Sequence, residues 1–154
     1  MNKKKQIALV AHDSMKVELA EWVDWNWEIL VKHRLICTGT TGKMVEKTIS
    51  AHHDAEDLKI TLLKSGPLGG DQQLGAKISE REIDLLVFFW DPMTAQPHDV
   101  DVKALMRLAS VYNIPMAINR STADFLISSP LFEGDYTPAV RDYTAYIERT
   151  LHQK

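Results

Sequence analysis

The stretch Leu85-Leu86-Val87-Phe88-Phe89-Trp90 (residues 85–90) decides the fold, because it is apolar at every position rather than at alternate positions. A strand with this pattern is buried on both faces, which is typical of the middle of a parallel sheet with helices on each side. We therefore predict a central strand over residues 83–90.

Similar apolar runs and helical spacings alternate on both sides of this strand. An alternation of strands and helices predicts an α/β fold of three layers (α/β/α), with a five-stranded, mainly parallel, doubly wound sheet. The other predicted strands are 6–11, 35–37, 59–63 and 114–118, and the predicted helices are 14–31, 42–49, 71–80, 101–112, 122–127 and 138–151.

Composition narrows the classes of protein that fit. The chain has 154 residues, of which 45% are hydrophobic, so we expect residues 1–154 to form a single domain. A net charge of -3 without a basic stripe disfavours nucleic acid as a partner. We find no secretory signal and no apolar run long enough to cross a membrane, and we expect a cytoplasmic protein. The single cysteine, Cys37, lies in an apolar run and is read as a small buried hydrophobe.

Polar side chains follow four of the predicted strands, at the point where each strand ends. In open α/β sheets, ligands bind beyond the carboxyl ends of the strands, so these side chains are expected to share one rim. In chain order the clusters are His12, Asp13 and Lys16; Thr38, Thr40 and Thr41; Ser65, Gly66 and Asp71; and Asp91, His98, Asp99 and Asp101.

The threonine and serine clusters are typical of an anion site. Thr38-Gly39-Thr40-Thr41 lies at a strand-to-helix turn, where backbone N–H groups and the helix dipole favour phosphate. Ser65 and Gly66 add small donors, and Lys16 adds a compact positive charge. No Walker spacing follows, which favours a small phosphate ester over a nucleoside triphosphate. The alternative is that these residues only cap helices.

The carboxylates and histidines are candidates for acid–base chemistry. Asp71 follows two glycines at the start of a predicted helix, where it either caps that helix or meets a ligand. Asp91 ends the most buried strand and either binds the loop backbone or acts on a ligand. His98 lies in a loop where Asp99 or Asp101 could fix its tautomer.

Metal and cofactor chemistry have little support in the sequence. No pair of histidines or cysteines has the spacing of a metal site. No Gly-x-Ser-x-Gly elbow surrounds Ser65, and no Gly-x-Gly-x-x-Gly fingerprint follows the first strand. We therefore expect neither a metal nor a cofactor.

Six motifs in sequence order resemble the methylglyoxal synthase family, and together they cover nearly the whole chain. The resemblance implies a five-stranded parallel sheet, a homohexamer, inhibition by inorganic phosphate, and conversion of dihydroxyacetone phosphate to methylglyoxal and phosphate. The motifs are Ala-Leu-Val-Ala-His-Asp (8–13), Thr-Gly-Thr-Thr-Gly (38–42), Ser-Gly-Pro-Leu-Gly-Gly-Asp-Gln-Gln (65–73), Phe-Phe-Trp-Asp-Pro (88–92), Pro-His-Asp-Val-Asp-Val-Lys-Ala-Leu (97–105) and Thr-Ala-Asp-Phe (122–125).

The same resemblance implies a role for each matching residue. Asp71 matches the catalytic base, and His98 matches the histidine that handles the substrate carbonyl oxygen. Family members can offer a C-terminal arginine to a neighbouring subunit. Arg149 is the candidate here, although its position relative to Tyr146 differs by one residue from the family pattern. The implied substrate and phosphate contacts are His12, Lys16, Thr38, Gly39, Thr40, Thr41, Ser65 and Gly66, and the implied supporting carboxylates are Asp13, Asp91 and Asp101.

Two other functions fit parts of this pattern. One is a non-catalytic module that binds small effectors, similar to the regulatory domain of carbamoyl phosphate synthetase. Such a module needs the anion site but not the acid–base set of Asp71, His98 and Asp101. The other is a triose-phosphate isomerase, which would form the same enediolate but retain the phosphate.

Overall fold

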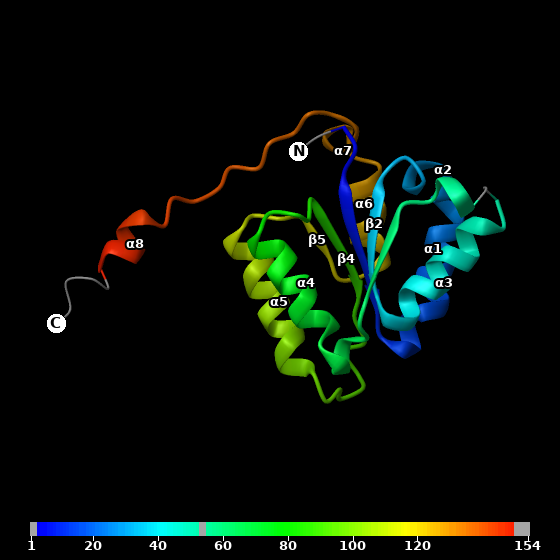
Figure 1. The fold of residues 1–154 in the computed structure, drawn as a ribbon, viewed down its shortest axis with the longest axis horizontal. Helices are drawn as coiled ribbons and strands as arrows, with labels where there is room; N and C mark the ends of the chain where they lie inside the picture. The colour runs from blue at the N-terminus through cyan, green and yellow to red at the C-terminus, as the bar shows by residue number, and fades with distance from the viewer. Residues whose placement is uncertain (1–2, 53–54, 150–154) are drawn as a thin grey trace.

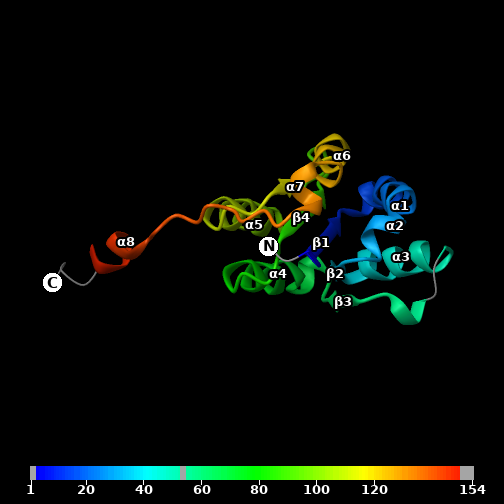
Figure 2. The same ribbon diagram turned by 90° about the horizontal axis from the view of Figure 1, so that it is seen from above.

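The computed structural model describes residues 3–52 and 55–149. Its centre is a five-stranded sheet in the order β3-β2-β1-β4-β5, and every neighbouring pair of strands is parallel. The sheet lies between two layers of helices, as Figures 1 and 2 show from two directions. This confirms the predicted three-layer α/β/α fold. The strands are β1 (Gln6–Ala11), β2 (Arg34–Thr38), β3 (Ile60–Leu63), β4 (Leu85–Phe89) and β5 (Met116–Ala117).

Strand β4 has the burial that its sequence predicts. All five of its residues are buried, and alternate side chains enter two separate cores. Leu85, Val87 and Phe89 pack on one face of the sheet, whereas Leu86 and Phe88 pack on the other. An all-apolar strand fits this environment because neither face meets water.

Two groups of helices supply the rest of these cores. On one face lie α1 (Lys16–Trp25), α2 (Trp27–Leu30), α3 (Gly39–Ser50) and α6 (Arg120–Ile127). On the other face lie α4 (Gly70–Ser79) and α5 (Asp99–Val111). Cys37 belongs to the first core, and burial raises the pKa of its thiol to about 12, in keeping with an inert hydrophobic role.

The predicted helix over 14–31 is wrong in one respect, because it is interrupted. A short 3₁₀ turn (Asp13–Met15) precedes α1, and Asn26 separates α1 from α2. The Asn26 side-chain amide donates to the carbonyl oxygen of Trp22 at 2.8 Å. An asparagine side chain that bonds the backbone in this way competes with the continuing helix.

The predicted C-terminal helix is also wrong at its start. It begins at Thr144 rather than at residue 138, as α8 (Thr144–Arg149). Asp142 sets this start, because its carboxylate accepts from both the backbone N–H and the hydroxyl of Thr144, at 2.9 and 2.6 Å. The remainder of the predicted helix, including Leu151, lies outside the described residues.

The other elements connect the layers. The helix α7 (Pro130–Glu133) was not predicted, and two short 3₁₀ turns, η2 (Ala55–Asp57) and η3 (Gly66–Leu68), flank β3. After α7 the chain runs as an extended arm that carries α8 away from the sheet (Figure 1). None of the helices in the described ranges is long and apolar enough to cross a membrane.

Candidate active site

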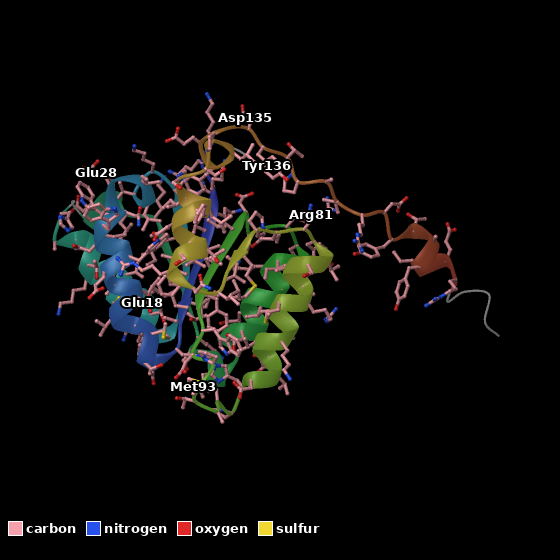
Figure 3. The ribbon with its side chains drawn as sticks, turned by 180° about the vertical axis from the view of Figure 1, so that it is seen from behind. Glu18, Glu28, Arg81, Met93, Asp135 and Tyr136 are labelled. Carbon is pink, nitrogen blue, oxygen red and sulfur yellow. The ribbon has the colours of Figure 1, made fainter. Side chains whose placement is uncertain are left out.

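A cavity of about 310 Å³ lies beyond the carboxyl ends of β1, β2 and β3. The sheet order reverses between β1 and β4, which is where open α/β sheets bind their ligands. In Figure 3 Met93, which follows β4, marks this end of the molecule, and Arg81 and Asp135 lie at the other end. The cavity is lined by Val10, Ala11, His12, Asp13, Lys16, Thr38, Gly39, Thr40, Thr41, Ser65, Gly66, Pro67, Asp71, Gln96 and His98.

Three of the predicted strand-end clusters meet at this cavity, together with His98 from the fourth. They meet because parallel strands in register end at the same edge: Ala11 is level with Phe89, and Thr38 with Leu63. The turn after β2 approaches the turn after β3 so closely that a side chain on Gly39 would overlap the Ser65 backbone. Gly39 also has a φ of +38°, which disfavours any residue with a Cβ.

One side of the cavity has the features of an anion site. The first turn of α3 contains Gly39, Thr40 and Thr41, and no side chain caps the N-terminus of this helix. Thr41 instead donates its hydroxyl to the carbonyl oxygen of Ala11 at 3.4 Å. The Gly39 N–H donates to the carbonyl oxygen of Lys64 at 3.1 Å, which leaves the backbone N–H groups of Thr40 and Thr41 as the donors that this helix start offers to a ligand.

Lys16 brings a positive charge to the same side. Its ammonium group contacts the carboxylate of Asp13 and the hydroxyl of Thr40. The hydrogen bond from Lys16, followed by the charge of Lys16, lowers the pKa of Asp13. Asp13 is exposed, so the ion pair contributes little to stability and can open at small cost when a phosphate arrives.

Asp71 lines the same cavity from the first turn of α4. It is only 2% exposed, and neither carboxylate oxygen has a hydrogen-bond partner within the described chain. It therefore does not cap its helix. Burial raises the pKa of Asp71, the facing His98 opposes this rise, and Asp101 adds to it. A buried carboxylate without partners has the raised basicity expected of a general base.

His98 lies next to Asp71 in the wall of the cavity. Its Nε2 atom is 3.6 Å from Oδ2 of Asp71, and both side chains are nearly buried. A Cβ on Gly66 would lie 2.9 Å from His98 Nε2 and 3.1 Å from Asp71 Oδ2, so glycine leaves space between the two groups. The prediction that Asp99 or Asp101 orients the ring is not reflected in the hydrogen bonds. Asp99 accepts from the backbone N–H of Gln96.

His12 completes the polar wall. Its Nδ1 accepts a hydrogen bond from the backbone N–H of Asp91 at 3.1 Å, while its Nε2 is buried without a partner among the described residues. Its ring packs edge-on against the ring of His98, with 5.4 Å between centroids. Burial, and then the neighbouring His98, lower the pKa of His12, which favours the neutral imidazole.

Three of the predicted site residues do not line the cavity. The Asp91 carboxylate points into its own loop, where it accepts from Ser14 Oγ at 2.7 Å and from the backbone N–H groups of Met93 and Thr94 at 2.8 and 3.3 Å. These hydrogen bonds, that of Ser14 first, lower the pKa of Asp91 to about 2. Of the two alternatives for this carboxylate, the structure therefore shows the loop contact.

Asp101 and Arg149 have different positions. Asp101 is half-buried and shares a second groove, between α4 and α5, with the far side of Asp71. Its backbone N–H donates to the carbonyl oxygen of His98 at 2.9 Å. Arg149 lies on α8 with its guanidinium 4.9 Å from the centre of the Tyr146 ring. Figure 1 shows α8 well away from the sheet, so within one chain Arg149 is remote from the cavity.

Sequence reasoning missed four residues of the wall: Val10, Ala11, Pro67 and Gln96. Gln96 is the polar one, and its position two residues before His98 in the same loop was a usable signal. Within residues 3–52 and 55–149, no group of three or more His, Cys, Asp or Glu side chains is arranged to hold a metal ion.

The chain is similar to known proteins over nearly its whole length. A model of the MGS-like domain matches residues 18–118. The methylglyoxal synthase of Maridesulfovibrio salexigens is 58% identical over 98% of this chain and 100% of its own length, and that of Coxiella burnetii is 54% identical over 96% and 98%. The crystal structure of methylglyoxal synthase from Elizabethkingia anophelis superimposes with a TM-score of 0.88 at 48% identity, covering 100% of this chain and 97% of the other. The chain therefore belongs to the methylglyoxal synthase family.

Proposed function

We propose that this protein converts dihydroxyacetone phosphate to methylglyoxal and inorganic phosphate, with Asp71 as the general base. The observation that carries the proposal is the Asp71 carboxylate. It is 2% exposed, has no hydrogen-bond partner within the described chain, and lies 3.6 Å from His98 in a cavity that Lys16 and the first turn of α3 also line. A base, an acid and a phosphate site within one small cavity suit a phosphorylated three-carbon ketone.

The first step is removal of a proton from the hydroxymethyl carbon of the substrate. Asp71 takes this proton, and the electrons of the broken C–H bond form a double bond to the carbonyl carbon. Negative charge then develops on the former carbonyl oxygen. His98 donates a hydrogen bond or a proton to that oxygen, and such preorganised donors are commonly worth about 3–4 kcal/mol each.

The second step is loss of phosphate. The hydroxyl on the first carbon becomes the aldehyde and gives up its proton, which leaves with the phosphate. The double bond moves to join the second and third carbons, and the C–O bond to phosphate breaks with its electron pair. The enol that remains becomes methylglyoxal by taking a proton at its terminal carbon and losing the proton of its hydroxyl. The reaction is redox-neutral overall, so it requires no redox cofactor, and we propose that the enzyme uses no cofactor or metal.

The anion site decides between elimination and isomerisation. An isomerase holds the C–O bond to phosphate in the plane of the enediolate, where the π electrons cannot expel it. We propose that the donors of residues 38–41 and 65–66, with Lys16, hold this bond perpendicular to the plane. Substrate and phosphate contacts from His12 and Asp13 belong to the same proposal.

Further roles rest on the family and are proposed with it. We expect a homohexamer in the cytoplasm, in which Arg149 reaches the site of a neighbouring subunit, since its own site is out of reach. We expect inorganic phosphate, the product, to inhibit by occupying the anion site. Asp101 acts on Asp71 through its charge, which raises the pKa of that carboxylate.

Product analysis tests the proposal directly. The purified protein is incubated with dihydroxyacetone phosphate, and methylglyoxal, inorganic phosphate and glyceraldehyde 3-phosphate are measured together. We expect methylglyoxal and phosphate in equal amounts, unaffected by a chelator. Glyceraldehyde 3-phosphate instead of phosphate would identify an isomerase, and binding without turnover would identify a non-catalytic effector module.

A further inference from the structure

The proposed mechanism leaves the hydroxyl on the first carbon of the substrate without a partner in the protein. The phosphate has Lys16 and the donors at the start of α3, the carbonyl oxygen has His98, and Asp71 takes the proton from the first carbon. A hydroxyl that moves from water into a cavity needs a new hydrogen-bond partner, because an unpaired one weakens binding. The proton of this hydroxyl therefore needs an acceptor in the cavity wall.

Few acceptors near the acid–base pair are open to that proton. Asp71 takes the proton from carbon, and Asp13 is in the ion pair with Lys16. His12 accepts from a backbone N–H at Nδ1, so its Nε2 carries the ring proton and is a donor. The side chain of Gln96, which also lines the cavity, has an acceptor oxygen and an NH₂ group that donates.

The backbone of Gln96 is fixed, and its side-chain amide is unpaired. Its backbone N–H donates to Oδ2 of Asp99 at 3.1 Å, and its carbonyl oxygen accepts from the backbone N–H of Asp99 at 3.2 Å. Pro97 follows and favours an extended backbone at Gln96. The half-buried side-chain amide has no hydrogen-bond partner among the residues that the structure describes. A fixed backbone that carries an unpaired amide suits a ligand contact.

Gln96 belongs to the loop that carries the acid–base histidine. It precedes His98 by two residues, which span at most about 7 Å of chain. His98 in turn is 3.6 Å from Asp71. This loop contributes none of the proposed phosphate donors, so the Gln96 amide is placed for the carbon that reacts rather than for the phosphate.

We propose that Gln96 binds the hydroxyl on the first carbon of the substrate, with its side-chain oxygen accepting the hydrogen bond. The inference rests on the proposed function and adds a residue that determines specificity. Holding the hydroxyl fixes the rotation about the bond between the first and second carbons. One C–H bond then stands perpendicular to the carbonyl plane and faces Asp71, where its electrons form the double bond. Gln96 takes no proton in this step.

The same contact selects the substrate. A phosphorylated ketone without this hydroxyl would leave the Gln96 amide unpaired in the complex. Because the side chain is only half-buried, water can replace part of the lost contact, and the selection is modest. We expect a preference of about 3–10-fold, which is the usual effect of one neutral hydrogen bond.

A binding cycle with two unreactive ligands tests the contact. Glycerol 3-phosphate and propane-1,2-diol 1-phosphate differ only in the hydroxyl that Gln96 is proposed to hold, and calorimetry gives both dissociation constants. The wild-type protein should bind glycerol 3-phosphate about 3–10-fold more tightly. Gln96→Met has a side chain of similar shape without the amide, and it should bind the two equally. The same preference in both proteins would overturn the inference. Weaker binding of inorganic phosphate to Gln96→Met would also overturn it, because the amide would then belong to the phosphate site.

Kinetics with dihydroxyacetone phosphate test the orienting role. Gln96→Met should lower kcat about tenfold, because the hydroxyl is no longer held and fewer bound molecules have a C–H bond aimed at Asp71. The control is Gln72→Met, which makes the same replacement at an exposed residue beside Asp71 and outside the cavity. Its kcat should equal that of the wild-type enzyme. An unchanged kcat in Gln96→Met would refute the orienting role.

The two tests separate this inference from the proposed function. If the wild-type protein released no methylglyoxal, the proposed function would fail. The binding cycle needs no turnover, so it would still show whether Gln96 holds the hydroxyl.

Discussion

Several buried polar groups at the two ends of the sheet differ in whether their own chain satisfies them. At the amino end, Lys5 is 1% exposed, yet its backbone N–H donates to His33 and its ammonium donates to the carbonyl oxygen of Gly134 at 3.1 Å. Asp84 accepts from the backbone N–H of Gln6 at 2.8 Å. At the carboxyl end, the buried atoms His12 Nε2, His98 Nδ1 and both oxygens of Asp71 have no hydrogen-bond partner among the described residues.

The paired groups at the amino end contribute to stability, and the unpaired groups at the carboxyl end are kept for function. A buried polar group that is paired with its own chain holds the structure together, and one left without a partner costs stability. Such a cost persists in a folded protein where the group serves a ligand. Substitutions at the amino end should therefore change stability alone, and substitutions at the carboxyl end should change activity.

The largest expected change in stability is at His33. His33→Ala leaves the Lys5 N–H buried without an acceptor and removes the ring that packs edge-on against Phe132. We expect a loss of about 2–4 kcal/mol in the free energy of unfolding, measured by denaturant titration. The kcat per folded molecule should not change. A large fall in kcat would mean that the two ends of the sheet are coupled.

The next effect is a change in kcat, and it is expected at Gly66. A methyl group there would lie within about 3 Å of both His98 and Asp71 and would push them apart. Gly66→Ala should lower kcat roughly 10–10²-fold, since sub-ångström misplacement of reacting groups is costly. Its control is Gly75→Ala, whose Cβ would meet only the side-chain ends of Leu108 and Leu105, at 3.1 and 3.8 Å. Equal kcat in the two variants would contradict the proposed joint action of His98 and Asp71.

A still smaller effect is expected in the pH dependence of stability. The pKa of Asp71 is raised in the folded state, so its contribution to stability is present below the unfolded pKa and is lost as the pH rises through the folded pKa. Asp71→Asn should therefore melt at a higher temperature than wild type at neutral pH, and the difference should vanish in acid. Melting temperature measured against pH would show this, and a less stable variant at neutral pH would contradict it.

The smallest expected effect has the opposite sign and belongs to Asp91. Its folded pKa is about 2, below the ordinary value of 3.8, so its stabilising contribution is present above 3.8 and is lost as the pH falls toward 2. In Asp91→Asn the loss of stability relative to wild type should therefore shrink over this acid range. A difference that does not depend on pH would assign the effect to packing rather than to charge.

Much of the site could be predicted, because parallel strands in register deliver their ends to one edge. This rule alone places His12, Thr38 and Ser65 at the edge of the sheet that carries the cavity. Neither the 3.6 Å approach of His98 to Asp71 nor the bond from the Asp91 amide to His12 could be predicted. Both depend on how a loop folds back, and loop geometry has no periodic signal in the sequence.

The ends of two helices could not be predicted from the sequence either. The break at Asn26 and the late start of α8 both arise from single side-chain hydrogen bonds to the backbone, made by Asn26 and Asp142. Hydrophobic spacing is insensitive to such bonds, so it extended both helices too far. The apolar pattern of β4, by contrast, was decisive because burial on both faces constrains every residue.

The most direct test of the account is the rate at which Asp71→Asn releases methylglyoxal from dihydroxyacetone phosphate. The amide keeps the shape of the side chain but cannot take a proton from carbon, so we expect kcat to fall by about 10³-fold or more while the variant stays folded. A rate near that of the wild-type enzyme would show that the buried carboxylate is not the base, and the proposed mechanism would be wrong.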